Sequence, residues 1–235
     1  MSEKGKSQQV ALPLPRAFPP RWKTPILPIR TLEILAALTP ETEARTRVFL
    51  KNVSEIPNQP VVFYRWLWLL THLKALPADL EPFFALYQKI LSRTVSLTKP
   101  EGLFALFFSG KILGKPPNSL KELARKRGFR ILADLYHLSR IIPELSTRHL
   151  SFVKASLNPD GGYGFFPHTT SFLENVYYAV RLYELSGTEP PAREKTLFFV
   201  KRCFRKGGFA RAPGGIPFLE STYYGIFLIK RLESF

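Results

Sequence analysis

The sequence predicts an all-α protein made of helical hairpins, and three observations lead to this prediction. From Arg30 onward, apolar residues recur three and four positions apart, the spacing that places them on one face of a helix. Segments that are apolar all round alternate with amphipathic segments, as expected where a buried helix is paired with a half-exposed one. Near the C-terminus a long segment is repeated in register. We therefore expect a ring or arc of about five hairpins.

The first 29 residues have a different character from the rest. They carry six prolines, which fix the backbone φ angle and remove N–H donors, so this stretch is expected to be an extended, polyproline-like arm. We predict that residues 1–29 lie against the protein's own domain. The alternatives are docking to a partner or a membrane, and simple disorder. Residues 30–235 then form a single domain.

Helical segments follow one another with few interruptions after residue 30. A lone first helix ends at Thr39, and the next segment starts with Pro40 and acidic residues, which helix starts favour. Apolar helices are expected at 59–76, 99–114 and 130–142. Amphipathic helices are expected at 40–56, 77–93, 119–129 and 144–157.

Two copies of one unit complete the chain. The segment "DGGYGFFPHTTSFLENVYYAVRLYEL" begins at Asp160, and "KGGFARAPGGIPFLESTYYGIFLIKR" begins at Lys206. They align without a gap, and upstream "FVKAS" matches "FVKRC" after a shift of one residue. The clearest repeats are thus 145–187 and 190–235, each with an amphipathic helix, a Gly-Gly loop and an aromatic helix. Internal periods of this length are typical of helical-hairpin arrays.

This unit resembles the repeat of the protein prenyltransferase β-subunits and of the squalene–hopene and related terpene cyclases. The resemblance is specific over residues 145–235 and weaker upstream, in "PVVFYRWLWLL" and "ILADLYHLSRII". It implies an α/α toroid, in which inner helices surround a central hollow. Prenyltransferase β-subunits have about six hairpins, so the resemblance implies a ring that is incomplete or that a partner or the arm closes.

The resemblance also implies which side chains would bind a ligand. Aromatic residues of the inner helices would line the hollow and suit an isoprenoid or another long apolar ligand: Tyr64, Trp66, Tyr177, Tyr178, Tyr223 and Tyr224. Basic residues near the Gly-rich loops would hold a diphosphate: Arg181, Lys206 and Arg211. The alternative is that the tyrosines merely fill a narrow core.

The known catalytic groups of these families have no match here. Prenyltransferases bind zinc through an Asp-x-Cys pair and a histidine at inner-helix starts. The pair corresponds here to Glu174 and Val176 or to Glu220 and Thr222, and the histidine to Asn175 or Ser221. Valine and threonine supply no thiolate. The acidic Asp-x-Asp-Asp cluster of the cyclases is also missing, and His72, His137, His149 and His168 lack metal-ligand spacing. We assign no metal, cofactor or catalytic residue.

The net charge and the cysteine content indicate which partners and which cellular location to expect. The formal net charge is +16, which favours polyanionic partners such as nucleic acid or an anionic membrane, although a solvated basic surface without a partner is equally consistent. The single cysteine, Cys203, excludes an internal disulfide. No apolar run reaches the length of a membrane span and no signal peptide opens the chain. We expect a cytoplasmic protein, with peripheral membrane attachment as the alternative.

Three functional hypotheses follow. The first is a prenyltransferase/terpene-cyclase-like protein that lacks the known motifs and binds an isoprenoid-type ligand in an aromatic cavity or acts as an assembly module. The second is an active prenyltransferase or terpene-processing enzyme with relocated catalytic groups. The third is a basic interaction subunit of a larger complex with protein, nucleic acid or an anionic membrane. The sequence leaves open whether the protein is an enzyme.

Overall fold

A computed structural model describes residues 38–51, 56–94, 99–115 and 118–234. The predicted arm, residues 1–29, and nearly all of the predicted first helix lie outside these residues. The described part is helical, and the prediction of an all-α protein is confirmed. The strands that it contains are the two-residue β1 (Phe204–Arg205) and β2 (Gly208–Phe209), which pair antiparallel.

Two kinds of helix alternate along the described chain. The more deeply buried set, called here the inner helices, consists of α3 (Pro60–His72), α5 (Pro100–Ile112), α7 (Leu132–Ile141), α10 (Leu173–Ser186) and α12 (Leu219–Glu233). The more exposed set consists of α2 (Pro40–Lys51), α4 (Glu81–Thr94), α6 (Asn118–Lys126), α8 (Glu144–Arg148), α9 (Leu150–Ala155) and α11 (Arg193–Arg202).

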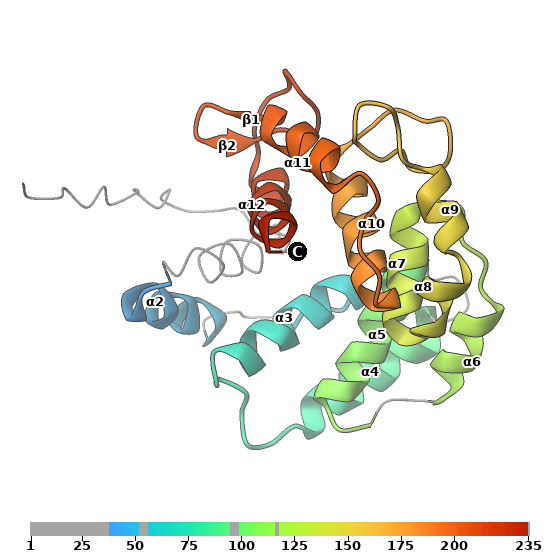
Figure 1. The fold of residues 1–235 in the computed structure, drawn as a ribbon. Helices are drawn as coiled ribbons and strands as arrows, with labels where there is room; N and C mark the ends of the chain where they lie inside the picture. Colours follow the sequence, from blue (N-terminus) through green and yellow to red (C-terminus); the bar gives the residue numbers. More distant parts are fainter. Residues whose placement is uncertain (1–37, 52–55, 95–98, 116–117, 235) are drawn as a thin grey trace, which may run out of the picture.

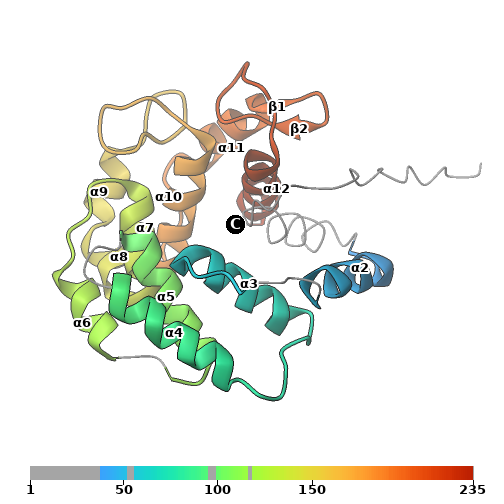
Figure 2. The same cartoon turned by 180° about the vertical axis from the view of Figure 1, so that it is seen from behind.

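The inner helices contact one another in chain order. α3 packs on α5, α5 on α7, α7 on α10, and α10 on α12, and Figures 1 and 2 show this succession following a curve. The exposed helices lie against them: α4 and α6 on α5, α8 and α9 on α10, and α11 on α12. The α2 helix is fastened by Arg47, whose Nε donates to the Leu73 carbonyl at 2.9 Å. This pairing agrees with the predicted alternation of apolar and amphipathic segments.

Local sequence signals set the ends of the inner helices. Pro60 and Pro100 occupy the first positions of α3 and α5, where a missing N–H has no intrahelical partner to lose. The α10 helix ends at Gly187, whose φ of 71° is the left-handed conformation that glycine adopts without a Cβ penalty.

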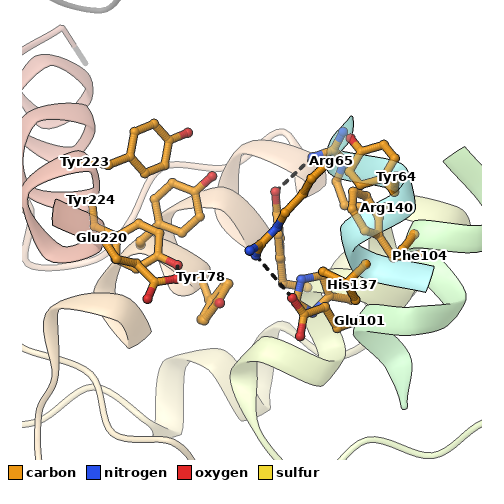
Figure 3. A pocket seen from close by; sticks show the side chains of 14 residues that line it. Tyr64, Arg65, Glu101, Phe104, His137, Arg140, Tyr178, Glu220, Tyr223 and Tyr224 are labelled. Atoms are coloured by element: carbon orange, nitrogen blue, oxygen red, sulfur yellow. Dashed lines mark hydrogen bonds and ion pairs between the residues drawn. The ribbon is translucent and has the colours of Figure 1, made fainter. Parts of the chain in front are cut away.

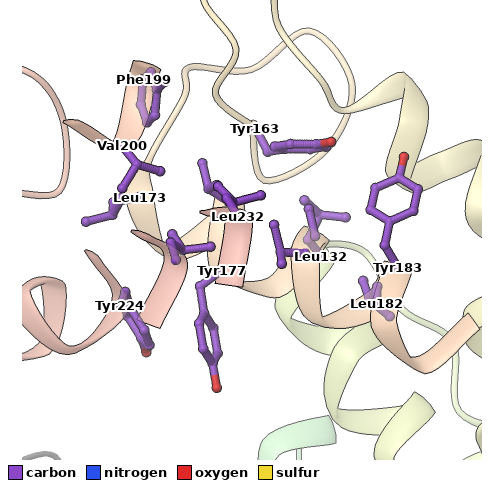
Figure 4. Close-up of a cluster of buried hydrophobic side chains, with 14 of the residues drawn as sticks. Leu132, Tyr163, Leu173, Tyr177, Leu182, Tyr183, Phe199, Val200, Tyr224 and Leu232 are labelled. Carbon is purple, nitrogen blue, oxygen red and sulfur yellow. The ribbon is translucent and has the colours of Figure 1, made fainter. Parts of the chain in front are cut away.

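The core has two parts that meet at α7. One is centred on α3 and α5 and includes the fully buried Phe63, Leu67 and Leu106. The other joins α7, α10, α11 and α12, and Figure 4 shows Tyr163 of the first Gly-rich loop placed over it with Phe199 of α11. The loop is therefore part of the hydrophobic packing.

The repeat predicted from the sequence is also a structural repeat. Phe172 N–H donates to the Tyr163 carbonyl at 3.1 Å, and 46 positions later Phe218 N–H donates to the Phe209 carbonyl at 3.2 Å. Upstream, the bond from Gly164 to Ser156 and the bond from Ala210 to Cys203 are both 2.9 Å long. The donors of these two bonds, Gly164 and Ala210, are 46 positions apart, but the acceptors, Ser156 and Cys203, are 47 positions apart. This difference agrees with the one-residue shift seen in the sequence upstream of the two loops.

Candidate functional site

One pocket is lined by all five inner helices, and Figure 3 shows it from close by. Its cavity volume is about 120 Å³. Fourteen side chains line it: Val61, Tyr64, Arg65, Glu101, Phe104, Ala105, Tyr136, His137, Arg140, Tyr177, Tyr178, Glu220, Tyr223 and Tyr224. The pocket is therefore the place where the successive hairpins converge.

Ten of the lining residues come from one pair of adjacent positions that recurs on every inner helix. The first position of the pair holds an aromatic ring: Tyr64, Phe104, Tyr136, Tyr177 and Tyr223. The second position varies: Arg65, Ala105, His137, Tyr178 and Tyr224. Because the helices pack in equivalent ways, equivalent positions face the same space. The chemistry of the pocket is set mainly by the second position.

The pocket contains five of the six aromatic residues expected to line a cavity. Tyr64, Tyr177, Tyr178, Tyr223 and Tyr224 all lie on its wall. The placement of Trp66 differs from the expectation. Its ring stacks on Phe83 of α4, with centroids 5.2 Å apart. Two residues along a helix amount to about 200° of rotation, so Tyr64 and Trp66 point to opposite sides of α3. Arg65 lines the pocket instead.

Ring contacts join the five helices across the wall. Going from α3 to α12, Tyr64 meets Phe104, Phe104 meets His137, His137 meets Tyr178, and Tyr178 meets Tyr224, at centroid distances of 5.2, 5.4, 5.8 and 6.3 Å. The Tyr64–Phe104 and Tyr178–Tyr224 pairs each contribute roughly 0.5–1.5 kcal/mol beyond their buried area. The same packing accounts for the small cavity, because the rings fill much of the space between the helices.

Two arginines bring positive charge to this aromatic wall. The Arg65 guanidinium lies 3.5 Å from the Glu101 carboxylate. The half-buried Arg140 donates to the Tyr136 hydroxyl at 2.8 Å and lies over the rings of Phe104 and Phe108. No carboxylate in the described part of the chain pairs with Arg140. Figure 3 shows these cations and His137 facing Tyr223, Tyr224 and Glu220 across the pocket.

The pocket also shifts the protonation of its own side chains. Burial lowers the pKa of His137 to about 3, helped by the nearby Arg140 and Arg65, so the imidazole is neutral at pH 7. Burial acts to raise the pKa of Tyr136, but the positive charges of Arg140 and Arg181 outweigh it and bring that pKa below its ordinary value. Burial keeps the pKa of the neighbouring Tyr177 well above its ordinary value.

The three basic residues expected to hold a diphosphate are not among the pocket-lining residues. Arg211 forms a two-point ion pair with Glu174. Arg181 pairs with Glu184 and lies over the Phe227 ring. Lys206 is exposed in the turn between β1 and β2. Arg65 and Arg140 were not among the residues predicted from the sequence, although the match of "YH" at 136–137 to "YY" at 177–178 could have located Arg140.

The positions that correspond to zinc ligands are occupied differently. Asn175 and Ser221 are buried at the starts of α10 and α12, and Cys203 is buried at the end of α11. Burial raises the pKa of the Cys203 thiol to about 12, which keeps it protonated. Within the described ranges, no three His, Cys, Asp or Glu side chains lie together as a metal site requires.

Basic residues are concentrated in two stretches of the sequence, 121–130 and 201–211, which lie in separate places. The first is centred on α6 and the second on the end of α11 and the β-hairpin, and Figures 1 and 2 show α6 and α11 well apart. They therefore do not combine into one continuous basic face. None of the described helices has the length and apolar character needed to cross a bilayer.

Comparisons with known proteins give no relative for this chain: no protein-family model matches it, and no curated protein sequence matches it.

Proposed function

We propose that this chain is a prenyltransferase/terpene-cyclase-like binding protein that holds the anionic end of an isoprenoid-type ligand in the pocket of the inner helices. The observation that carries the proposal is Arg140, a half-buried guanidinium on an aromatic wall with no carboxylate partner among the described residues. The family resemblance suggests an isoprenoid-type ligand, and the pocket of the inner helices is the proposed binding site.

The proposed architecture is an α/α toroid, as a ring or an arc. The chain-order packing of the inner helices supports it, because each of these helices lies against the inner helix that precedes it in the chain. The convergence of all five helices on one pocket also supports it. A stack of hairpins without curvature has no common axis at which five successive inner helices can meet.

An anion fits the hydrogen-bonding needs of the pocket. A guanidinium has five N–H donors, and Arg140 uses one of them on the Tyr136 hydroxyl. A phosphate oxygen accepts such donors in a two-point geometry and is bound more strongly than a neutral acceptor. Tyr178 and Tyr223 line the same pocket and carry further hydroxyl donors, whereas the Tyr224 hydroxyl already donates to Glu220. The surrounding rings suit the first carbons of a prenyl chain.

The cavity volume limits how much of the ligand can enter. Pockets for drug-sized ligands usually enclose about 300–1,000 Å³, and this one encloses about 120 Å³. The pocket therefore takes the phosphorylated end, and the remainder of a long prenyl chain lies outside it. Affinity should consequently depend strongly on the phosphate group and weakly on chain length.

Titration calorimetry with four compounds tests the proposal: isopentenyl diphosphate, farnesyl diphosphate, inorganic pyrophosphate and farnesol. We expect both prenyl diphosphates to bind with affinities within about tenfold of each other, and farnesol not to bind. Arg140→Gln should weaken diphosphate binding at least tenfold, since a charge-assisted hydrogen bond contributes about 1.5–3 kcal/mol. The matched control is Arg148→Gln, an exposed arginine on α8. Equal affinities of wild type and Arg140→Gln would exclude the pocket as the site.

An enzymatic role is a second candidate, favoured by the lowered pKa of Tyr136. A buried phenol beside the Arg140 and Arg181 guanidiniums releases its proton more easily than an ordinary tyrosine, which suits proton transfer to or from a bound ligand. If the protein is a prenyl-transferring or terpene-processing enzyme, Tyr136→Phe should abolish turnover of a prenyl diphosphate while leaving its binding within about threefold. Product analysis by mass spectrometry distinguishes the two candidates.

A further inference from the structure

Each of two inner helices begins against the Gly-rich loop of the next unit. The Leu132 N–H at the start of α7 donates to the Phe165 carbonyl at 2.9 Å, and the Leu173 N–H at the start of α10 donates to the Arg211 carbonyl at 2.7 Å. Both leucines are fully buried. The loop of one unit thus covers the helix start of the unit before it.

Arg211 makes three contacts with the start of α10. Its carbonyl accepts from Leu173, its guanidinium pairs with the Glu174 carboxylate at two points, and that guanidinium lies 4.7 Å from the centre of the Phe172 ring. The tripeptide Phe172-Leu173-Glu174 therefore binds one arginine through both the backbone and the side chain of that arginine, which stands at a bend of the loop. We call Phe-Leu-Glu at a helix start the arginine receptor.

The start of α12 carries the same tripeptide, but Arg211, whose guanidinium the Glu220 carboxylate also influences through its charge, forms its ion pair with Glu174. Phe218, Leu219 and Glu220 repeat the tripeptide, and Phe218 has the extended backbone of Phe172. Yet Leu219 is 40% exposed, whereas Leu173 is fully buried. Within the described residues, the Glu220 carboxylate bonds to the Tyr224 hydroxyl and to no cation. The nearby Ile216 is 87% exposed.

We propose that residues 13–20 of this chain, "PLPRAFPP", bind the arginine receptor of α12, with Arg16 taking the part that Arg211 takes on α10. Arg16-Ala17 and Arg211-Ala212 are the two Arg-Ala dipeptides in the sequence, and a proline follows each within two residues. The Arg16 guanidinium complements the Glu220 carboxylate, and its carbonyl complements the Leu219 N–H. Glu220 also lines the pocket of the inner helices, so the proposed contact lies at the pocket wall, but it requires no ligand in the pocket.

The segment suits this role physically. Its prolines favour an extended backbone, which lowers the entropy lost on binding. Ten extended positions from Pro20 to Arg30 and eight positions from Arg30 to Leu38, in the helix predicted from the sequence, together span roughly 46 Å, more than the roughly 40 Å diameter of a compact domain of this size. Attachment in the same chain raises the effective concentration of the segment to the millimolar range.

Binding of this segment would link the two ends of the helical array. The segment precedes α2 in the chain, and the receptor lies at the start of the last inner helix. The segment would also cover Leu219 and Phe218, which in the preceding unit correspond to side chains covered by a loop.

A zero-length carbodiimide crosslink tests the contact in the full chain. Arg16→Lys keeps the positive charge and supplies an amine that can be joined to the Glu220 carboxylate, and peptide mass spectrometry identifies the product. The matched control is Arg211→Lys, in which the new amine at position 211 should be joined to Glu174. In the Arg16→Lys protein we expect a crosslink between position 16 and Glu220 within one chain. Recovery of the control crosslink without the crosslink to Glu220 overturns the proposal.

Mixing isotopically heavy and light Arg16→Lys chains shows whether the bound segment 13–20 belongs to the same chain or to a second copy. Crosslinks that join heavy to light peptides would show a second copy as the occupant and would overturn binding in the same chain. If the Arg211→Lys control does not form its crosslink to Glu174, hydrogen exchange of the backbone amides tests the proposal instead. Arg16→Glu should lower the protection of the Leu219 N–H at least tenfold and leave that of Leu173 unchanged; unchanged protection of Leu219 overturns the proposal.

Discussion

Arg211 and Glu174 lie 37 positions apart in the sequence and form a two-point ion pair that fastens the last Gly-rich loop to the first turn of α10. The pair is partly exposed, with 45% of the Arg211 side chain and 21% of the Glu174 side chain accessible. The pair matters because it connects two successive repeat units, one through its Gly-rich loop and the other through the glutamate of its Phe-Leu-Glu tripeptide.

Removing the Arg211 side chain should weaken the contact between the last Gly-rich loop and α10 and so lower the stability of the protein. Exposed ion pairs contribute up to about 1 kcal/mol, so we expect Arg211→Ala to lower the free energy of unfolding by about 1 kcal/mol in urea titrations. The control is Arg202→Ala on the exposed face of α11. A reversed pair, Arg211→Glu with Glu174→Arg, should restore part of the loss. Additive effects of the two reversals would contradict a direct interaction.

Gly161 and Gly207 are equivalent in the repeat but should tolerate alanine differently. Both have a left-handed φ, 84° and 80°, so alanine costs about 1–2 kcal/mol of backbone strain at either site. A Cβ at Gly161 would lie 2.3 Å from the Lys195 carbonyl oxygen, whereas at Gly207 no atom lies within 4 Å. Thermal unfolding should therefore show a larger loss for Gly161→Ala. Equal losses would contradict the packing of the first loop on α11.

The neutral His137 should make stability sensitive to acid. The unfolded chain binds a proton at this imidazole below its ordinary pKa of about 6.5, whereas the folded protein does so only near pH 3. Stability from this group is thus full above pH 6.5 and falls as the pH drops toward 3, by up to about 1.4 kcal/mol per pH unit.

The measurement is the pH dependence of the free energy of unfolding between pH 7 and 5. His137→Tyr, which gives α7 the residue that α10 and α12 carry, should reduce the slope. His168→Gln, at an exposed loop position, should keep the wild-type slope. Identical slopes in wild type and His137→Tyr would show that the imidazole is accessible to protons in the folded protein.

Cys203 should react as a buried thiol. It is 1% exposed, and burial raises its pKa to about 12, so little thiolate exists at pH 8. An aromatic disulfide reagent should label the native protein at least 100-fold more slowly than the urea-unfolded chain. Ser119→Cys, at an exposed position on α6, provides a fast-reacting control on the folded protein. Rapid native labelling of Cys203 would place it at the surface.

Periodicity and the repeat predicted most of the described fold. The inner helices were visible in the sequence because their apolar character extends around the helix, and the Gly-rich loops because their glycines and Phe-Leu-Glu recur in register. The pocket was harder to predict. At Tyr64, Arg65 and Trp66 a rotation of about 100° per residue decides which side chain faces the pocket, and aromatic character alone does not fix that rotation.

Arg140 was missed for a different reason. The α7 helix matches α10 with an offset of 41 positions, whereas α10 matches α12 with an offset of 46, so one repeat length does not bring Tyr136 into register with Tyr177. The cations near the Gly-rich loops were more conspicuous, but Arg211 is engaged in joining units. Packing between units, which the sequence does not display, separates structural arginines from those that face the pocket.

A crystal structure of the protein with isopentenyl diphosphate bound tests the central claim most directly, namely that the inner helices converge on an anion-binding pocket. We predict phosphate density within hydrogen-bonding distance of the Arg140 guanidinium, with tyrosine rings of α10 and α12 against the prenyl carbons. Density for the ligand elsewhere, with Arg140 still bonded to Tyr136 alone, would contradict the account.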